Sequence, residues 1–153
     1  KKVIILHELA LTSENTIMDN KSKQQRSLNM KMIKGRDTAP EILLRKAIWR
    51  KGYRYLKNYK KFPGKPDIAF PGKKKVIFVN GCFWHKHDCK FFSYPNTSSE
   101  FWTVKINRNA ERDKQNYYEL SKLGWSYFVV WTCELKKKNF DDTLEKVISY
   151  LNS

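Results

Sequence analysis

The segment from Gly64 to Cys89 constrains the fold of this chain more than any other, because two β-prone runs lead directly into a group of cysteines and histidines. The runs Asp67 to Phe70 and Val76 to Val79 are joined by a proline-glycine turn signal with a basic tip. This pattern is typical of a β-hairpin. Antiparallel pairing would bring Asp67, which opens the first strand, close to Val79 and Asn80 at the end of the second.

Asp67 has two interpretations at this position. Its carboxylate and the backbone around Val79 and Asn80 would converge at one edge, and hard cations such as Mg²⁺ bind oxygen ligands of this kind. Alternatively, Asp67 only caps a turn after Pro66, which is a common use of aspartate. The histidines and cysteines that follow favour the metal site.

The residues from Cys82 to Cys89 include two of the three cysteines and two of the three histidines of the chain. Together with a distant third cysteine they supply the thiolate and imidazole ligands that a closed tetrahedral zinc site requires, namely Cys82, His87, Cys89 and Cys133. An odd number of cysteines argues against a disulfide framework, and three buried, reduced cysteines are the alternative. If His87 binds zinc, His85 is free to act as a general base or a phosphate contact.

The charge of the chain indicates a polyanionic partner. Its 153 residues have the length of one domain, and 31 Lys and Arg against 15 Asp and Glu give a formal net charge of +16. With 14% aromatic residues, this composition favours a nucleic acid held by phosphate contacts and base stacking. A merely soluble basic protein is the alternative. The sequence contains no apolar run of the length that spans a membrane.

The N-terminal region divides into two parts. Residues 1–17 carry no net charge and are expected to be a non-native or upstream extension, with an extra strand at Val3 to Leu6 as the alternative. Residues 18–36 are basic and are expected to form an arm or short helix that contacts DNA. Residues 37–153 then form the main domain.

The rest of the chain predicts helices on either side of a sheet. A capping box at Thr38 to Glu41 predicts a helix to about Lys51, with a core face of Ile42, Leu43, Ala47 and Ile48. The apolar run Trp125 to Trp131 predicts a strand buried on both faces, parallel to the second hairpin strand. Cys133 could then reach back to the Cys82 to Cys89 loop, and Asp141 to Leu151 predicts a terminal helix packed on the sheet.

A longer helix is expected from about Glu100 to Leu123, with a buried stripe of Ile106, Ala110, Tyr117 and Leu120. Asp113 lies on this stripe, where an unpaired carboxylate would be costly. We expect His85 to be its partner, and an ordinary salt bridge with a nearby Lys or Arg is the alternative. Trp102, Lys105 and Asn109 share one face of the same helix.

Six pieces, in this order, carry a resemblance to a known family: RSLNM, GRDTAPE, FPGKPD, VIFVNGCFWHKHDC, EFWTVKINRNAERD and GWSYFVVWTCEL. They cover residues 22–136 and resemble the very-short-patch repair (Vsr) DNA mismatch endonucleases. The resemblance implies an α/β fold of the PD-(D/E)xK restriction-endonuclease-like type, with a mixed sheet flanked by helices and a structural zinc site. It also implies Mg²⁺-dependent nicking of one strand of duplex DNA beside a T:G mismatch.

The resemblance further implies roles for individual residues. Asp67 and the main-chain carbonyl of Val79 would bind Mg²⁺, and His85, oriented by Asp113, would be the general base. Asn80 and Glu41 would lie beside the metal; closing the helix cap is a sufficient structural role for Glu41. The DNA contacts would be Met30, Phe83, Trp84, Trp102, Lys105 and Asn109, of which Met30 would wedge into the minor groove, with a core methionine as the alternative.

One departure from the family pattern bears on activity, because Val79 and Asn80 stand where the best-known members have a Thr-His pair. Two other functions therefore stay open. One is a sequence-specific restriction-type endonuclease of the same fold, and the other is a catalytically impaired, zinc-stabilised DNA-binding protein. The resemblance also implies a bacterial cytoplasmic enzyme with a functional link to a cytosine-5 DNA methyltransferase. We expect a monomer, because the mismatch site is not itself palindromic.

Overall fold

The computed structural model of the chain describes residues 22, 24–25, 28, 32, 35–96 and 98–153. The chain divides into two units, residues 1–33 and 34–153, and the strands and helices named below belong to the second unit. The expectations for residues 1–17 and for Met30 lie outside the described residues. No helix in the described part of the chain is both long enough and apolar enough to cross a membrane.

A four-stranded mixed sheet forms the centre of the fold, with the strands in sequence order: β1 (Leu56–Lys57), β2 (Ile68–Phe70), β3 (Lys75–Asn80) and β4 (Ser126–Trp131). β1, β2 and β3 pair antiparallel, and β3 and β4 pair parallel. The predicted hairpin is confirmed, and its turn is the short 3-10 helix η1 (Pro71–Lys73). The predicted parallel pair is confirmed too, since β3 and β4 are parallel neighbours. The long helix α3 (Ser99–Lys122) lies between them in the chain.

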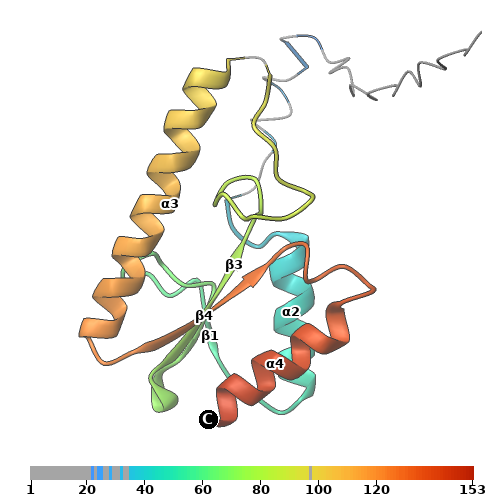
Figure 1. The fold of residues 1–153 in the computed structure, drawn as a ribbon. Helices are drawn as coiled ribbons and strands as arrows, with labels where there is room; N and C mark the ends of the chain where they lie inside the picture. Colours follow the sequence, from blue (N-terminus) through green and yellow to red (C-terminus); the bar gives the residue numbers. More distant parts are fainter. Residues whose placement is uncertain (1–21, 23, 26–27, 29–31, 33–34, 97) are drawn as a thin grey trace, which may run out of the picture. The chain divides into compact units, whose positions relative to one another are not determined.

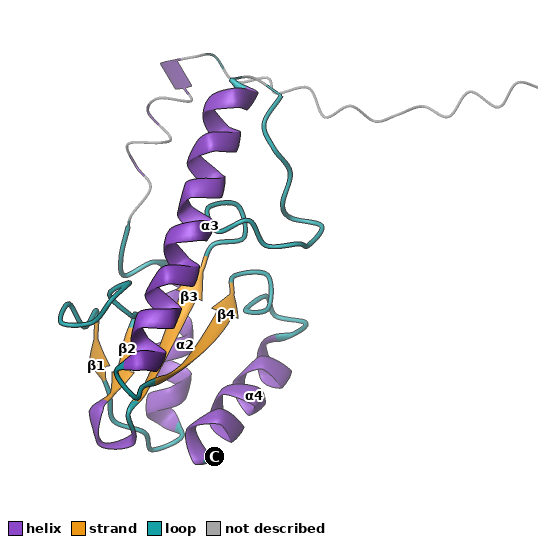
Figure 2. Cartoon of the chain, turned by 60° about the vertical axis from the view of Figure 1, so that its left-hand side comes forward, coloured by secondary structure: helices purple, strands orange, loops and turns teal. Residues whose placement is uncertain are grey.

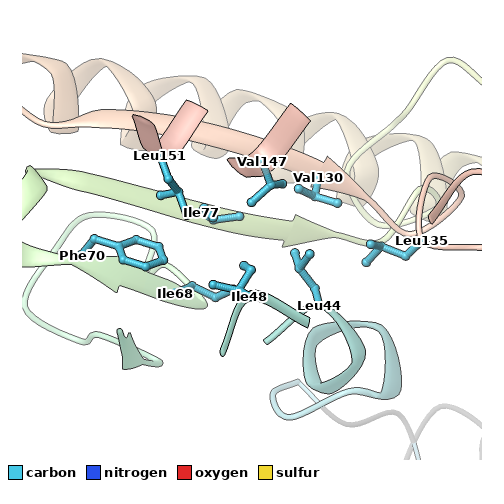
Figure 3. Close-up of a cluster of buried hydrophobic side chains, with 9 residues drawn as sticks. All are labelled: Leu44, Ile48, Ile68, Phe70, Ile77, Val130, Leu135, Val147 and Leu151. Carbon is cyan, nitrogen blue, oxygen red and sulfur yellow. The ribbon is translucent and has the colours of Figure 1, made fainter. Parts of the chain in front are cut away.

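Helices cover both faces of this sheet (Figure 1). α2 (Ala39–Arg50) and α4 (Phe140–Asn152) lie on one face, and α3 lies on the other, in front of the strands in Figure 2. Since successive side chains of a strand point to opposite faces, β3 supplies both layers. Ile77 packs with α2 and α4 (Figure 3), whereas Val76 and Phe78 pack with Leu120 of α3. The predicted terminal helix on the sheet is thereby confirmed as α4.

The predicted core face of α2 is only partly correct. Ala47 and Ile48 are buried as expected, but Ile42 and Leu43 are 38% and 46% exposed. The buried stripe instead consists of Glu41, Leu44, Arg45 and Ile48, which have the spacing of one helix face. Two of these residues are charged, so hydrophobicity alone pointed to the wrong side of the helix.

The start of α2 also differs from a capping box. Thr38 is the N-cap, but its side chain makes no capping hydrogen bond to the helix. Instead, the Glu41 carboxylate accepts hydrogen bonds from the Asp37 backbone N–H at 2.8 Å and the Thr38 hydroxyl at 2.7 Å. Asp37 in turn accepts from Arg45 Nη2 at 2.6 Å. This network fixes the Glu41 side chain and pairs Arg45 through Nη2, whereas the buried Nη1 of Arg45 has no hydrogen-bond partner among the described residues.

The expectation that Trp125 to Trp131 is buried on both faces is wrong. The strand begins at Ser126, and of its residues only Val130 is fully buried, while Tyr127 is 39% exposed. The strand order places β4 at the edge of the sheet. An edge strand has a neighbour on one side only, and a run of apolar residues does not reveal this lateral position.

Candidate active site

The carboxylate of Asp67 lies at the point where β2 begins and β3 ends. Its Oδ2 accepts a hydrogen bond from the Val79 backbone N–H at 2.7 Å. The pKa of Asp67 is raised from 3.8 to about 6. Burial is the largest cause and the nearby Glu41 carboxylate adds to it, while the Val79 hydrogen bond partly offsets the rise. The hairpin therefore holds a partly desolvated carboxylate against the end of β3, as its register predicts.

A pocket of about 620 Å³ opens over this carboxylate. All the residues proposed from the sequence to surround the catalytic metal line it: Glu41, Asp67, Val79, Asn80, His85 and Asp113. They come from α2, the position just before β2, β3, the loop after β3, and α3. We call this cavity the catalytic pocket.

The sequence interpretation did not include four other polar or cationic residues of the catalytic pocket: Lys65, Arg112, Asn116 and Tyr117. Three of them lie on α3, and two of these, Asn116 and Tyr117, are three and four residues from Asp113, the spacing of one helix face. That spacing was the available signal, because any side chain three or four residues from Asp113 shares its direction. The two cations give the pocket of carboxylates a positive rim.

His85 and Asp113 are in contact, as expected. His85 Nδ1 hydrogen-bonds Asp113 Oδ2, and both side chains are largely buried. The His85 backbone N–H donates to the Gly81 carbonyl at 3.2 Å, which fixes the tight loop after β3. Because Nδ1 is engaged, the other ring nitrogen, Nε2, is the one left to exchange a proton.

Asn80 is buried at 5% exposure and is anchored to α3. Its Nδ2 donates a hydrogen bond to the Tyr117 hydroxyl at 2.9 Å. Burial raises the pKa of Tyr117 to about 12, the Asn80 hydrogen bond opposes this, and the Asp113 and Asp67 carboxylates add to it. The phenol therefore stays neutral beside the two carboxylates.

Phe83, Trp84 and Trp102 form an aromatic cluster between the loop after β3 and α3. Trp102 lies 5.4 Å from Phe83 and 5.9 Å from Trp84, measured between ring centroids. Phe83 and Trp84 are half-buried, because they pack on each other and on Trp102. Lys105 Nζ lies 5.4 Å from the Trp102 ring centroid, and Asn109 Nδ2 donates to the Trp84 carbonyl at 3.1 Å.

The four predicted zinc ligands also come together. The ligand atoms of Cys82, His87, Cys89 and Cys133 all lie within 4.8 Å of one another, and we call this group the Cys/His cluster. The His87 ring stacks on Trp131, with 4.1 Å between centroids and 2° between planes. Three thiols and one imidazole at this separation fit the donor set of a tetrahedral metal site.

The protonation of the Cys/His cluster favours metal binding. Burial opposes ionisation of Cys82, but hydrogen bonds with Thr132, His87 and Cys133 outweigh it and lower the pKa of this thiol to about 6. Burial and the neighbouring Cys82 raise the pKa of Cys133 to about 12. The Cys82 thiolate is thus favoured at neutral pH, and a bound cation would draw the proton off Cys133.

Comparison with known proteins identifies the family. The family model described as "DNA mismatch endonuclease Vsr" matches residues 18–91. The type II nicking enzyme V.NmeAIP of Neisseria meningitidis serogroup A is 46% identical over 114 residues, which cover 74% of this chain and 81% of that protein. DNA mismatch endonuclease Vsr of Escherichia coli strain K12 is 41% identical over 118 residues, 77% of this chain and 76% of that protein. Type II nicking enzyme V.XorIIP of Xanthomonas oryzae is 38% identical over 117 residues, 76% of this chain and 86% of that protein. This chain therefore belongs to the Vsr family of DNA mismatch endonucleases.

Proposed function

We propose that this protein nicks one strand of duplex DNA next to a T:G mismatch by Mg²⁺-dependent hydrolysis of a phosphodiester. The observation that carries the proposal is the catalytic pocket, where the carboxylates of Asp67 and Glu41 and the His85–Asp113 pair line one cavity. The aromatic cluster stands on the same loop and helix as that pair. In this proposal the fold is of the PD-(D/E)xK restriction-endonuclease-like type.

The donor set of the catalytic pocket fits Mg²⁺, because carboxylate and carbonyl oxygens are its preferred protein ligands. We assign the ion to Asp67 and the Val79 carbonyl, with Glu41 beside it. The Val79 N–H faces Asp67, and the N–H and C=O of one strand residue point toward the same neighbouring strand. When bound, Mg²⁺ would stabilise negative charge on the phosphate and on the leaving oxygen.

His85 is the proposed general base. Asp113 accepts from Nδ1, which leaves Nε2 to take a proton from the attacking water, and the carboxylate then stabilises the imidazolium that forms. Lys65 and Arg112 line the same pocket and offset the charge of the bound phosphate. Asn80 stands next to Val79 where the best-known members of the family have a histidine. Because an amide does not act as a base at neutral pH, we assign the role of general base to His85 alone.

The aromatic cluster is the proposed mismatch-recognition element. Wedging aromatic side chains into a base step opens a duplex, and Lys105 and Asn109 stand beside the rings to hydrogen-bond the exposed bases. In the same proposal, residues 18–36 form a DNA-contacting arm in which Met30 enters the minor groove. The net charge of +16 supplies phosphate contacts along the duplex.

A structural zinc ion at the Cys/His cluster would hold the loop that carries His85, Phe83 and Trp84. A site with four protein ligands has no open position, so it takes no part in the chemistry. The wider role we propose is repair of T:G pairs that arise from deaminated 5-methylcytosine, in the bacterial cytoplasm, by a monomer linked in function to a cytosine-5 DNA methyltransferase. A stable dimer in sedimentation would favour the restriction-type alternative.

The test is a nicking assay on end-labelled duplexes that differ only in a T:G or a T:A pair, placed in several sequence contexts, with Mg²⁺. We expect cleavage of one strand of the T:G duplex, lost in Asp67→Ala and in His85→Ala. Asp141→Ala, on α4, is the matched control and should keep full activity. Cleavage of both strands of the paired duplex would indicate a restriction-type enzyme, and binding without cleavage a DNA-binding protein.

A further inference from the structure

Four residues form a shared wall between two cavities. Asn80, His85, Asp113 and Tyr117 line the catalytic pocket and also a second pocket of about 580 Å³ between the His85 to Asp88 loop and α3. Asp113 and Tyr117 are one helical turn apart on α3, so their side chains point the same way. The Tyr117 side chain thus stands in the same wall as the general-base pair, although nothing in the proposed mechanism uses it.

The position of the Tyr117 ring is fixed from two sides. The ring stacks on Tyr127 of β4, with 4.5 Å between centroids and 14° between planes, and it lies 5.2 Å from the Phe78 ring of β3. Asn80, itself buried, donates from Nδ2 to the hydroxyl oxygen at 2.9 Å. In this hydrogen bond the Asn80 amide is the donor, so the Tyr117 hydroxyl oxygen is the acceptor.

A hydroxyl group has one proton to donate in addition to the lone pairs that accept. Within the described residues, the hydrogen bond from Asn80 is the one that the Tyr117 hydroxyl makes. The hydroxyl proton therefore has no acceptor in this part of the protein. The group lies among carboxylates and cations that are arranged around a phosphate in the proposed function. A non-bridging phosphate oxygen is an acceptor that would suit this donor.

We propose that Tyr117 is a further catalytic residue, whose hydroxyl donates to a non-bridging oxygen of the scissile phosphate, and that Asn80 is the positioning residue that orients it. This inference rests on the proposed function. It also assigns a role to Asn80, which stands where the best-known members of the family have a histidine. The Asn80 amide acts through the Tyr117 hydroxyl rather than on the substrate.

A double-mutant cycle tests this division of roles on the T:G duplex with Mg²⁺. Tyr117→Phe removes only the hydroxyl and should lower kcat by about 100- to 1000-fold, the order of loss typical for one transition-state donor, with KM changed by less than about 2-fold. Asn80→Ala should lower kcat by a smaller factor. Because Asn80 acts through Tyr117, the double variant should be no slower than Tyr117→Phe alone.

Tyr118→Phe is the matched control, because Tyr118 is the next residue of α3 and is 54% exposed. It should keep wild-type kcat. Thermal unfolding of each variant separates a folding defect from a catalytic one. Wild-type kcat in Tyr117→Phe, or losses that multiply in the double variant, would overturn the inference while leaving the proposed nicking activity intact.

A second measurement does not depend on turnover. The full chain is labelled with 3-fluorotyrosine, Tyr117→Phe assigns the fluorine resonance of position 117, and the T:G duplex is added with Ca²⁺ in place of Mg²⁺. We expect a shift of this resonance that Asn80→Ala reduces. A shift in a protein that fails to nick would support the phosphate contact and reject the proposed function, whereas no shift on addition of the duplex would reject the contact itself.

Discussion

The carboxylate of Asp67 is placed where its charge is disfavoured. It is largely buried, it lies near Glu41, and its pKa is raised from 3.8 to about 6. Two carboxylates that share a small cavity repel each other until a cation joins them. The residue best placed to bind a metal is therefore also one that weakens the folded protein when no metal is there.

This conflict predicts that Asp67→Asn stabilises the metal-free protein at neutral pH. The folded pKa of about 6 lies above the unfolded value of 3.8, so the unfolded state releases its proton first and the wild type loses stability as the pH rises between these values. Asparagine can still accept from the Val79 N–H without the charge. The variant should gain about 1 to 3 kcal/mol near pH 7.5, measured by urea unfolding without Mg²⁺.

The gain should vanish at about pH 3, below both pKa values, where Asp67 is protonated in the folded and the unfolded state. Asp141→Asn, in the first turn of α4, serves as the control and should show no such gain. Equal stability of Asp67→Asn and the wild type at both pH values would mean that the Asp67 charge costs the fold nothing. Nicking should be lost in Asp67→Asn at every pH.

At the scale of elements, one loop carries both the metal cluster and the proposed chemistry. Cys82 precedes Phe83, Trp84 and His85 along it, and His87 and Cys89 follow them, while the fourth residue of the Cys/His cluster, Cys133, lies just beyond β4. The His87 N–H donates to the Cys82 carbonyl at 3.0 Å, so the ligands brace the loop from both sides. In the proposed function, removal of the metal would therefore also release His85, the proposed general base, and the aromatic cluster.

We therefore expect chelation at neutral pH to abolish nicking and to lower Tm, and one equivalent of Zn²⁺ per chain to restore both, since four-ligand zinc sites contribute directly to folding. Mg²⁺ alone should restore neither, which is the control for the catalytic ion. Cys133→Ser should behave like the chelated protein. Full activity in a protein shown by elemental analysis to contain no zinc would contradict this assignment.

The element boundaries were largely predictable, but the burial of the elements was not. Turn residues and apolar runs located the hairpin, and helix periodicity placed α3 within one residue at each end. The same periodicity failed for α2, because Glu41 and Arg45 occupy its buried face, where Glu41 accepts from Asp37 and Thr38 and Arg45 donates to Asp37. The predicted burial of β4 was wrong as well, because the composition of a strand does not show whether it lies at the edge of the sheet.

The candidate site was predictable where a motif carried it. The Cys/His cluster and the His85–Asp113 contact follow from residue types that have few other uses at such spacing. Lys65, Arg112 and Tyr117 were missed, since a surface cation or a half-buried tyrosine has many ordinary roles. The spacing from Asp113 on α3 was a signal for Tyr117, but no local pattern contains how α3 crosses the sheet, and the places of Lys65 and Arg112 in the pocket depend on that packing.

For the whole molecule, the dominant quantity is the net charge of +16. Each phosphate contact releases counterions, so the affinity for duplex DNA should fall at least about 100-fold between roughly 50 and 200 mM salt, as expected for four or more contacts. Fluorescence anisotropy with a labelled duplex, in Ca²⁺, measures the slope. The ratio of affinities for T:G and T:A duplexes should change little, because base recognition is not screened in the same way.

Lys105→Ala provides the comparison at a single residue. It removes a cation that lies beside the aromatic cluster. We expect it to lower the ratio of affinities for T:G and T:A duplexes, with a smaller effect on the dependence of affinity on salt. An affinity that is flat across this salt range would mean that the excess charge serves something other than phosphate contacts.

The Cys/His cluster draws its ligands from two segments that lie on either side of α3 and β4 in the chain. During synthesis, Asp67 and His85 leave the ribosome well before Cys133 does. A nascent chain therefore carries the side chains proposed for hydrolysis before the residue that completes the Cys/His cluster. The order of residues along the polypeptide thus delays a DNA-cutting centre until the scaffold that controls it has been translated.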